Sequence, residues 1–130
     1  MDVHLKVASV LHIGLGILGI LASLFILLGF SVISFLIGMN APSPEALPVV
    51  SIVAVIGFFI TGLTMISPLF GVAAGVGMYK RAQWGRILGI VASILYLPVH
   101  FPFGAILGVY TLWILLSSEA NTLFDNRSSF

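Results

Sequence analysis

The sequence contains no cysteine and very little charge. Only 7% of its 130 residues are charged, with five Lys and Arg against four Asp and Glu, whereas a soluble domain carries roughly 25%. Without cysteine the chain has no disulfide, thiol nucleophile, thiolate metal site or iron–sulfur cluster. Because so few charges cannot cover a soluble fold of this size, we expect lipid to surround most of its surface.

Acidic side chains are missing from the apolar stretches, since Asp2, Glu45, Glu119 and Asp125 all flank them. This argues against proton-coupled exporters that rely on an embedded acid, and against paired-acid hydrolysis or metal binding. The net charge of +1 is too small to favour a nucleic-acid partner. We therefore predict no enzymatic activity, and assign no catalytic, cofactor-binding or metal-binding residues.

Four apolar runs are present, at about 7–39, 47–79, 84–97 and 103–118. The first two are longer than the roughly 20 residues that cross hydrocarbon. A proline-containing segment at 40–48 separates them, and Pro98 and Pro102 divide the shorter pair. The runs show no alternation of period two, which favours helices over a barrel. We predict an all-α integral membrane protein, a single domain over 1–130, in which four transmembrane helices form a long first hairpin and a short second one.

The basic residues all fall on one side of this topology. Together with an interfacial tryptophan they form the predicted anchors, which are Lys6, Lys80, Arg81, Trp84, Arg86 and Arg127. The loops on the opposite side contain no Lys or Arg. Lys and Arg collect on the cytoplasmic side of membrane proteins, so both termini are predicted to be cytoplasmic, with the bacterial inner membrane as the expected location.

The first two helices are too long for a bilayer. About 31 residues reach about 46 Å, against a hydrocarbon thickness of about 30 Å. Anchoring at Lys6 and Lys80 places the surplus, 27–37 and 49–59, on the outer side, where its apolar side chains need a cover. Identical subunits are the simplest cover, and a different membrane protein, a thick membrane or a re-entrant fold are the alternatives.

Small and polar residues recur at spacings of three and four, which keeps them on one face of a helix. The glycines predicted to serve helix packing are Gly16, Gly19, Gly71, Gly75, Gly85, Gly89, Gly104 and Gly108. The polar seam, which would line a pore if there is one, comprises His12, Ser51, Thr61, Thr64 and Ser67.

Three histidines raise the question of a metal or haem. His4 and His12 belong to the cytoplasmic end of the first helix, and we expect His100, in an opposite loop, to lie roughly a bilayer thickness away. Such spacing disfavours a bis-histidine haem within one subunit. His12, about one turn inside the apolar core, is either a functional residue or a neutral imidazole bonded to a backbone carbonyl or to Ser9.

Residues 79–116 carry two recognisable stretches. These are Lys80-Arg-Ala-Gln-Trp84-Gly-Arg86-Ile-Leu-Gly-Ile90 and Pro102-x-Gly104-x-x-Leu107-Gly-x-Tyr110-x-Leu-Trp113-x-Leu-Leu116. This part of the chain resembles small, uncharacterised four-transmembrane-helix proteins of bacteria. The resemblance implies a four-pass integral membrane protein and supplies no catalytic residues.

Three functions remain open at this point. The first is a non-enzymatic, oligomer-forming membrane protein that acts as a structural or accessory subunit, with lipid and either further copies or another membrane protein as partners. The second is a homo-oligomeric channel or pore lined by the polar seam. The third and weakest is a haem-binding or redox subunit.

Overall fold

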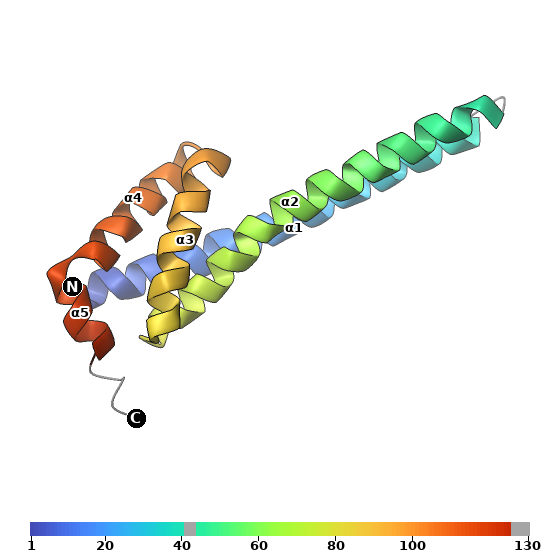
Figure 1. The fold of residues 1–130 in the computed structure, drawn as a ribbon. Coiled ribbons are helices and arrows are strands. Elements are labelled where there is room, and N and C mark those ends of the chain that lie inside the picture. The colour runs from blue at the N-terminus through green and yellow to red at the C-terminus, as the bar shows by residue number, and fades with distance from the viewer. Residues whose placement is uncertain (41–43, 126–130) are drawn as a thin grey trace. The chain divides into compact units, whose positions relative to one another are not determined.

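The computed structural model describes residues 1–40 and 44–125, and this part is entirely helical apart from short connections. It comprises α1 (Asp2–Asn40), a 3-10 turn (Pro44–Ala46), α2 (Leu47–Tyr79), α3 (Gln83–Val99), α4 (Phe103–Leu116) and α5 (Ser118–Asp125) (Figure 1). The predicted all-α class is confirmed. Helices α1 and α2 are each long and apolar enough to cross a membrane, whereas α4 and α5 meet that description only as a pair bent by 72°.

Two predicted boundaries differ from the structure. Helix α3 continues through Pro98 to Val99. A proline in the last turn of a helix costs only the one hydrogen bond that its missing N–H would donate. The turn still closes, because the His100 N–H donates to the Tyr96 carbonyl at 3.1 Å. Helix α4 ends at Leu116 rather than Ser118, since Ser117 adopts an extended backbone there. The short α5 that follows is absent from the sequence prediction.

The chain packs as two compact units. The core unit comprises Met1–Leu18 and Ser67–Phe130, and the hairpin unit comprises Gly19–Ile66.

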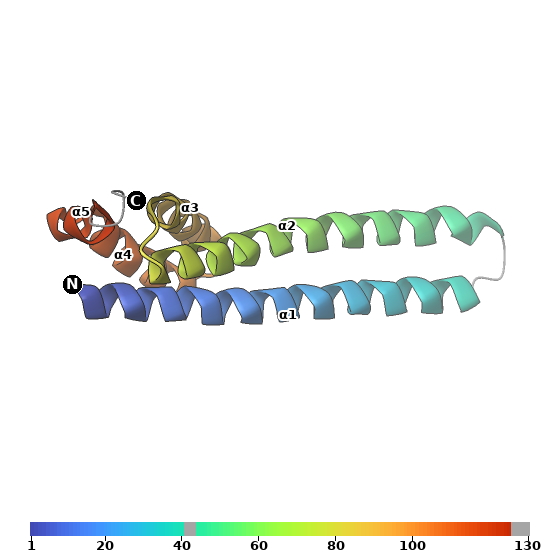
Figure 2. The same ribbon diagram turned by 90° about the horizontal axis from the view of Figure 1, so that it is seen from below.

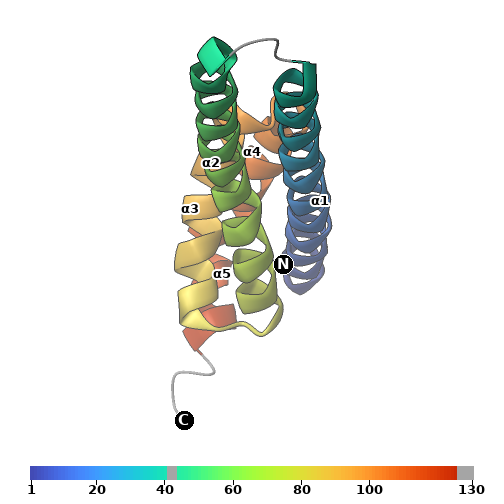
Figure 3. The same ribbon diagram turned by 90° about the vertical axis from the view of Figure 1, so that its right-hand side faces the viewer.

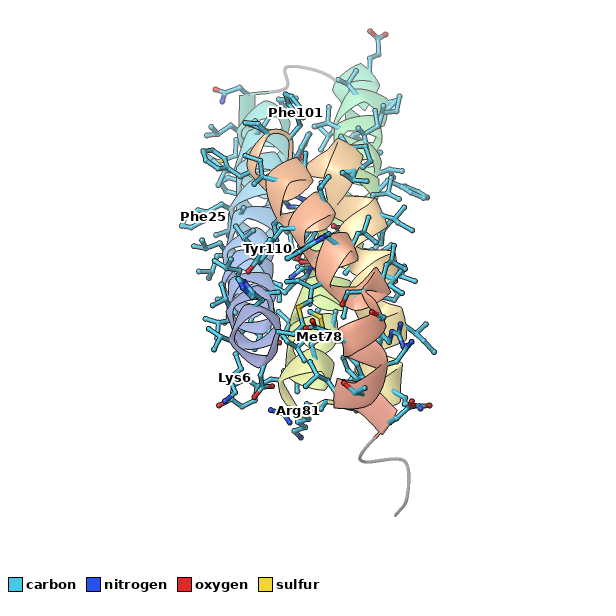
Figure 4. The ribbon with its side chains drawn as sticks, turned by 90° about the vertical axis from the view of Figure 1, so that its left-hand side faces the viewer. Lys6, Phe25, Met78, Arg81, Phe101 and Tyr110 are labelled. Atoms are coloured by element: carbon cyan, nitrogen blue, oxygen red, sulfur yellow. The ribbon has the colours of Figure 1, made fainter. Side chains whose placement is uncertain are left out.

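Alanines and larger apolar side chains together form the centre of the core unit. The buried apolar residues are Leu5, Ala8, Ala74, Met78, Ala92, Ile114, Leu115, Ala120 and Phe124. They come from α1, α2, α3, α4 and α5, so every helix contributes to one core. Met78 reaches into the space between these helices (Figure 4). Because lipid does not drive apolar helices together, close packing of this kind has to hold them.

The turn from α2 to α3 is a Schellman motif built on Arg81. The Ala82 N–H donates to the Gly77 carbonyl and the Arg81 N–H to the Met78 carbonyl, both at 3.0 Å. Arg81 has the left-handed φ of 54° that this motif requires and that glycine usually supplies. The same side chain forms an ion pair with Asp2, which ties the turn to the start of α1.

The end of α4 is held by Arg86 of α3. Its Nε and one terminal nitrogen donate to the Leu115 carbonyl at 3.2 and 2.9 Å, and the other terminal nitrogen donates to the Asn121 side chain at 2.6 Å. Ser117 then begins α5, because its hydroxyl accepts from the Ala120 N–H at 3.3 Å. Arg86 therefore joins α3, α4 and α5.

In the hairpin unit the two parts of α1 and α2 run antiparallel and side by side (Figures 2 and 3). Phe30 packs against Gly57, where a Cβ would lie 2.5 Å from the ring. The Thr61 hydroxyl is buried and donates to the carbonyl of Gly57 at 2.8 Å. Most large apolar side chains of this unit, such as Phe25, point outward instead (Figure 4).

Candidate functional site

His12 lies on the buried side of α1 in the core unit. Its Nδ1 is 3.0 Å from the Ala8 carbonyl oxygen. Because a carbonyl only accepts, Nδ1 carries the proton, and the lone pair of the neutral ring is on Nε2. The side chain is fully buried, and Nε2 finds no hydrogen-bond partner in the described part of the chain. The sequence left His12 as either a functional residue or a neutral imidazole bonded to a backbone carbonyl or to Ser9. The bond to a backbone carbonyl is present, but it provides a partner for only one of the two ring nitrogens.

Tyr96 of α3 joins His12 to His100. The His12 and Tyr96 rings are stacked with centroids 5.4 Å apart, and the Tyr96 and His100 rings meet edge to face at 4.9 Å. The prediction that His100 lies a bilayer thickness from His12 is therefore wrong. Tyr96 lies near the end of α3, and its ring contact with His12 brings that end of the helix to the level of His12. Partial burial lowers the pKa of His100, which lies just beyond α3, because desolvation disfavours the charged imidazolium.

This cluster, which we call the His–Tyr cluster (His12, Tyr96 and His100), contains an unusual number of orphaned polar atoms. The Tyr96 hydroxyl and the His100 Nδ1 are buried and, like His12 Nε2, lack a hydrogen-bond partner among residues 1–40 and 44–125. Ser67 and Thr111, also in the core unit, each have a buried hydroxyl that lacks a hydrogen-bond partner among the described residues. Buried polar groups are nearly always paired, so these atoms are where a bound water, ion or ligand is expected.

Glycines make room for the cluster. The Tyr96 hydroxyl lies against Gly71 of α2, in space that a Cβ would occupy, and the His100 side chain lies against Gly104 of α4 in the same way. Gly16 faces α2, where a Cβ would lie 2.8 Å from the Pro68 carbonyl oxygen. Two of the glycines assigned to packing, Gly71 and Gly104, thus contact the His–Tyr cluster.

The other packing glycines bring helices of the core unit together elsewhere. Gly75 meets the Ser9 carbonyl oxygen and Gly108 the Ser93 carbonyl oxygen, each 2.7 Å from an added Cβ. Gly85 lies against Gly77, and Gly89 against Leu115 and Met78. Gly19, in the hairpin unit, is half-buried, and its carbonyl accepts from the Ser23 hydroxyl at 2.9 Å.

The residues of the polar seam differ in their burial. Thr61 and Ser67 are buried in different units, Thr64 is half-buried and Ser51 is exposed. The hydroxyls of Ser51, Thr61 and Thr64 donate to carbonyls of their own helix. His12 belongs to the His–Tyr cluster. That these positions line a pore stays a prediction.

The predicted anchors gather at one end of the core unit. Lys6 and Arg81 lie at that end and Phe101 at the other (Figure 4). Trp84 is half exposed, and its ring packs on Gly77. Arg127 lies outside the described residues. A further aromatic group stands near this end, where His4 Nδ1 is 2.8 Å from the Tyr110 hydroxyl and both side chains contact Trp113.

Tyr96 was not singled out from the sequence, although a signal exists. It precedes His100 by four residues, and in a helical turn residues four apart lie on the same face. A tyrosine in the middle of an apolar run also needs a partner for its hydroxyl.

No family model matches this chain, and searches of the curated proteins and of the solved structures found no match.

Proposed function

We propose that the chain is a non-enzymatic integral membrane protein of four spans that assembles with copies of itself and serves as a structural or accessory subunit. Its termini face the cytoplasm, and the membrane is the bacterial inner membrane. The basic residues at one end of the core unit support this orientation through the positive-inside rule.

The observation that carries the proposal is the uninterrupted length of α1 and α2. They contain 39 and 33 residues, or about 58 and 50 Å at 1.5 Å per residue, against about 30 Å of hydrocarbon. A tilt of 40°, the upper end of the usual range, does not remove this surplus from α1. Part of the hairpin unit must therefore extend beyond the hydrocarbon.

The hairpin unit leaves that surplus uncovered. Phe35 is 65% exposed, Val55 55% and Phe59 66%. Single exposed apolar side chains are ordinary, but a continuous apolar surface of this kind outside lipid is typical of an interface. Copies of the same hairpin offer a matching apolar surface, so self-association covers it without a second type of chain.

Helices α3 and α4 complete the proposed four spans as a short pair. Their 17 and 14 residues reach about 25 and 21 Å, less than the hydrocarbon thickness. A short pair is accommodated by local thinning of the bilayer or by flanking residues that reach the interface.

Cysteine cross-linking tests the assembly, and the cysteine-free sequence makes it clean. Variants Phe35→Cys and Val55→Cys, purified in lipid nanodiscs and oxidised, are expected to form disulfide-linked dimers. Val109→Cys serves as the control because Val109 is comparably exposed, at 59%, but lies on α4 of the core unit. Mass photometry of the unmodified protein gives the oligomeric state. A monomer, or cross-linking that is equally strong at Val109, would contradict self-association through the hairpin.

A further inference from the structure

We propose that the pocket between α3 and α5 binds one anionic phospholipid, with the phosphate at Arg86 and an acyl chain along the apolar side of α3. The pocket lies within the core unit. The proposal rests on the proposed placement of that unit in the membrane, and it does not depend on self-association of the hairpin.

The pocket is open at the start of α3, next to α5 (Figure 1). Its volume is about 320 Å³. The lining residues are Gln83, Arg86, Ile87, Ile90 and Phe124. Among the residues that the structure describes, neither carboxylate of α5, Glu119 or Asp125, belongs to this lining. The pocket therefore combines one positive charge with an apolar wall.

The polar and the apolar lining follow one another along α3. Successive lining residues of this helix are one, three or four positions apart, so they share one face. Gln83 and Arg86 come first, directly after the turn on Arg81 at the basic end of the core unit (Figure 4). Ile90 lies about 10 Å further along the helix than Gln83, at 1.5 Å per residue. A polar head followed by an apolar tail fits this order, with the head at the membrane surface.

Arg86 offers a positive charge that is already oriented. A guanidinium has five N–H groups, and three of those of Arg86 donate to the Leu115 carbonyl and the Asn121 side chain. Both acceptors are neutral, so they hold the guanidinium without offsetting its charge. The ring of Phe124, whose centroid is 6.0 Å from the guanidinium carbon, supports it from one side. The remaining N–H groups can donate to phosphate oxygens, for which arginine is well suited.

The two parts of the pocket together favour an anionic phospholipid over other occupants. A free phosphate would satisfy Arg86 but leave Ile87, which is 64% exposed, uncovered. A zwitterionic lipid would cover Ile87 and Ile90 but leave the positive charge without a net negative partner. Basic pockets between helices on the cytoplasmic side are typical sites for anionic headgroups.

Lipid titration tests the site in the full chain, purified in detergent micelles. Native mass spectrometry compares the binding of phosphatidylglycerol, which has one negative charge, with that of zwitterionic phosphatidylcholine of the same acyl chains. We expect the first phosphatidylglycerol to bind about fivefold more tightly, the factor that one basic side chain contributes toward an anionic lipid. Inorganic phosphate is expected to compete only weakly, because it has no chain for the apolar wall.

One pair of variants tests the phosphate position. Gln83→Glu places a negative charge in the pocket and is expected to weaken phosphatidylglycerol binding about fivefold. The fold should tolerate it, because an acidic side chain is favourable in the first turn of a helix. Thr122→Glu is the matched control, since it adds the same charge to an exposed position of α5. Thr122 is two positions from Phe124 and so lies on a different face of α5, and lipid binding should stay unchanged.

A second pair tests the apolar wall. Ile87→Trp fills this part of the pocket and is expected to weaken the binding of both lipids. Ile94→Trp is its control, because Ile94 is also exposed on α3, at 54%, but does not line the pocket. Binding to this variant should match that of the unmodified protein.

Three results would overturn the proposal. These are equal affinity for the two lipids, equal effects of Gln83→Glu and Thr122→Glu, and inorganic phosphate binding as tight as that of the lipid, which would make the ligand a free anion. Should Gln83→Glu fail to fold, NMR of the unmodified protein decides. Side-chain N–H signals of Gln83 and Arg86 that do not shift on addition of phosphatidylglycerol would exclude the site.

The failure of this site and the failure of the proposed topology give different results. Labelling of cysteines at positions 45 and 119 reports the topology without any added lipid. The expected labelling pattern combined with equal affinity for both lipids would reject the site alone. A reversed labelling pattern combined with a preference for phosphatidylglycerol would retain the site and reject the orientation.

Discussion

The hydroxyl of Tyr96 lies against the backbone of Gly71, in the space that a β-carbon at residue 71 would fill. This contact fixes how closely α3 approaches α2 at the level of the His–Tyr cluster.

Gly71→Ala is expected to destabilise the protein by about 1–3 kcal/mol, the usual cost of overpacking a tight contact. The added methyl group must push Tyr96, and α3 with it, away from α2. Chemical denaturation in detergent micelles, followed by circular dichroism, measures the change in free energy of unfolding. Removing the hydroxyl in the double variant Gly71→Ala/Tyr96→Phe should recover part of the loss.

Gly14→Ala is the matched control for Gly71→Ala, because an added Cβ at Gly14 meets no other described atom within 4 Å. Its stability should be unchanged or slightly higher, since alanine favours the helix over glycine by about 1 kcal/mol. Equal effects of the two alanine substitutions would refute the role assigned to the contact with Tyr96.

Arg86→Lys is expected to reduce stability by about 1.5–3 kcal/mol, the range for hydrogen bonds to a charged group. Lysine keeps the positive charge, but a single ammonium cannot replace the forked donors that reach the Leu115 carbonyl and the Asn121 side chain. Hydrogen exchange should increase in α5 and in the last turn of α4. Lys6→Arg is the control, because it changes a basic side chain that does not have the paired donors of Arg86. Hydrogen exchange in α5 and in the last turn of α4 should stay unchanged in this variant.

Ser117→Ala is expected to fray α5 and to cost about 1 kcal/mol, because the Ala120 N–H loses its capping hydroxyl. Hydrogen exchange across residues 118–125 provides the measurement. Ser118→Ala changes a neighbouring serine that does not cap the helix and should have little effect. If both variants exchange alike, the cap is not what begins α5.

The predicted orientation can be tested with two matched cysteine variants, Glu45→Cys and Glu119→Cys, in intact cells. Both replace an exposed glutamate, and the sequence contributes no other cysteine. A membrane-impermeant maleimide should label residue 45 from outside and residue 119 only after permeabilisation. Labelling of both from the same side would disprove the four-span topology, and labelling of residue 119 alone from outside would reverse the orientation.

The sequence predicted the helices well because their signals are local. Long apolar runs bounded by Asn40 and Pro48 specify where α1 ends and α2 begins to within a few residues, whatever the rest of the chain does. The α5 helix was missed because its eight residues are largely polar, and the bend at Ser117 depends on a capping hydroxyl together with Arg86, which is 31 positions earlier in the sequence.

The sequence by itself determined the helical class, the long apolar segments and the distribution of charge, since composition and periodicity fix these without reference to distant residues. Only the tertiary structure decided that His12, Tyr96 and His100 meet. Position along the chain gives the order of these residues but not how far each lies from the ends of the core unit. That distance depends on the length of α3 and on how closely the helices approach at Gly71 and Gly104. The physical reason is that contacts between helices arise from the fit of several surfaces at once, whereas a helix arises from its own residues.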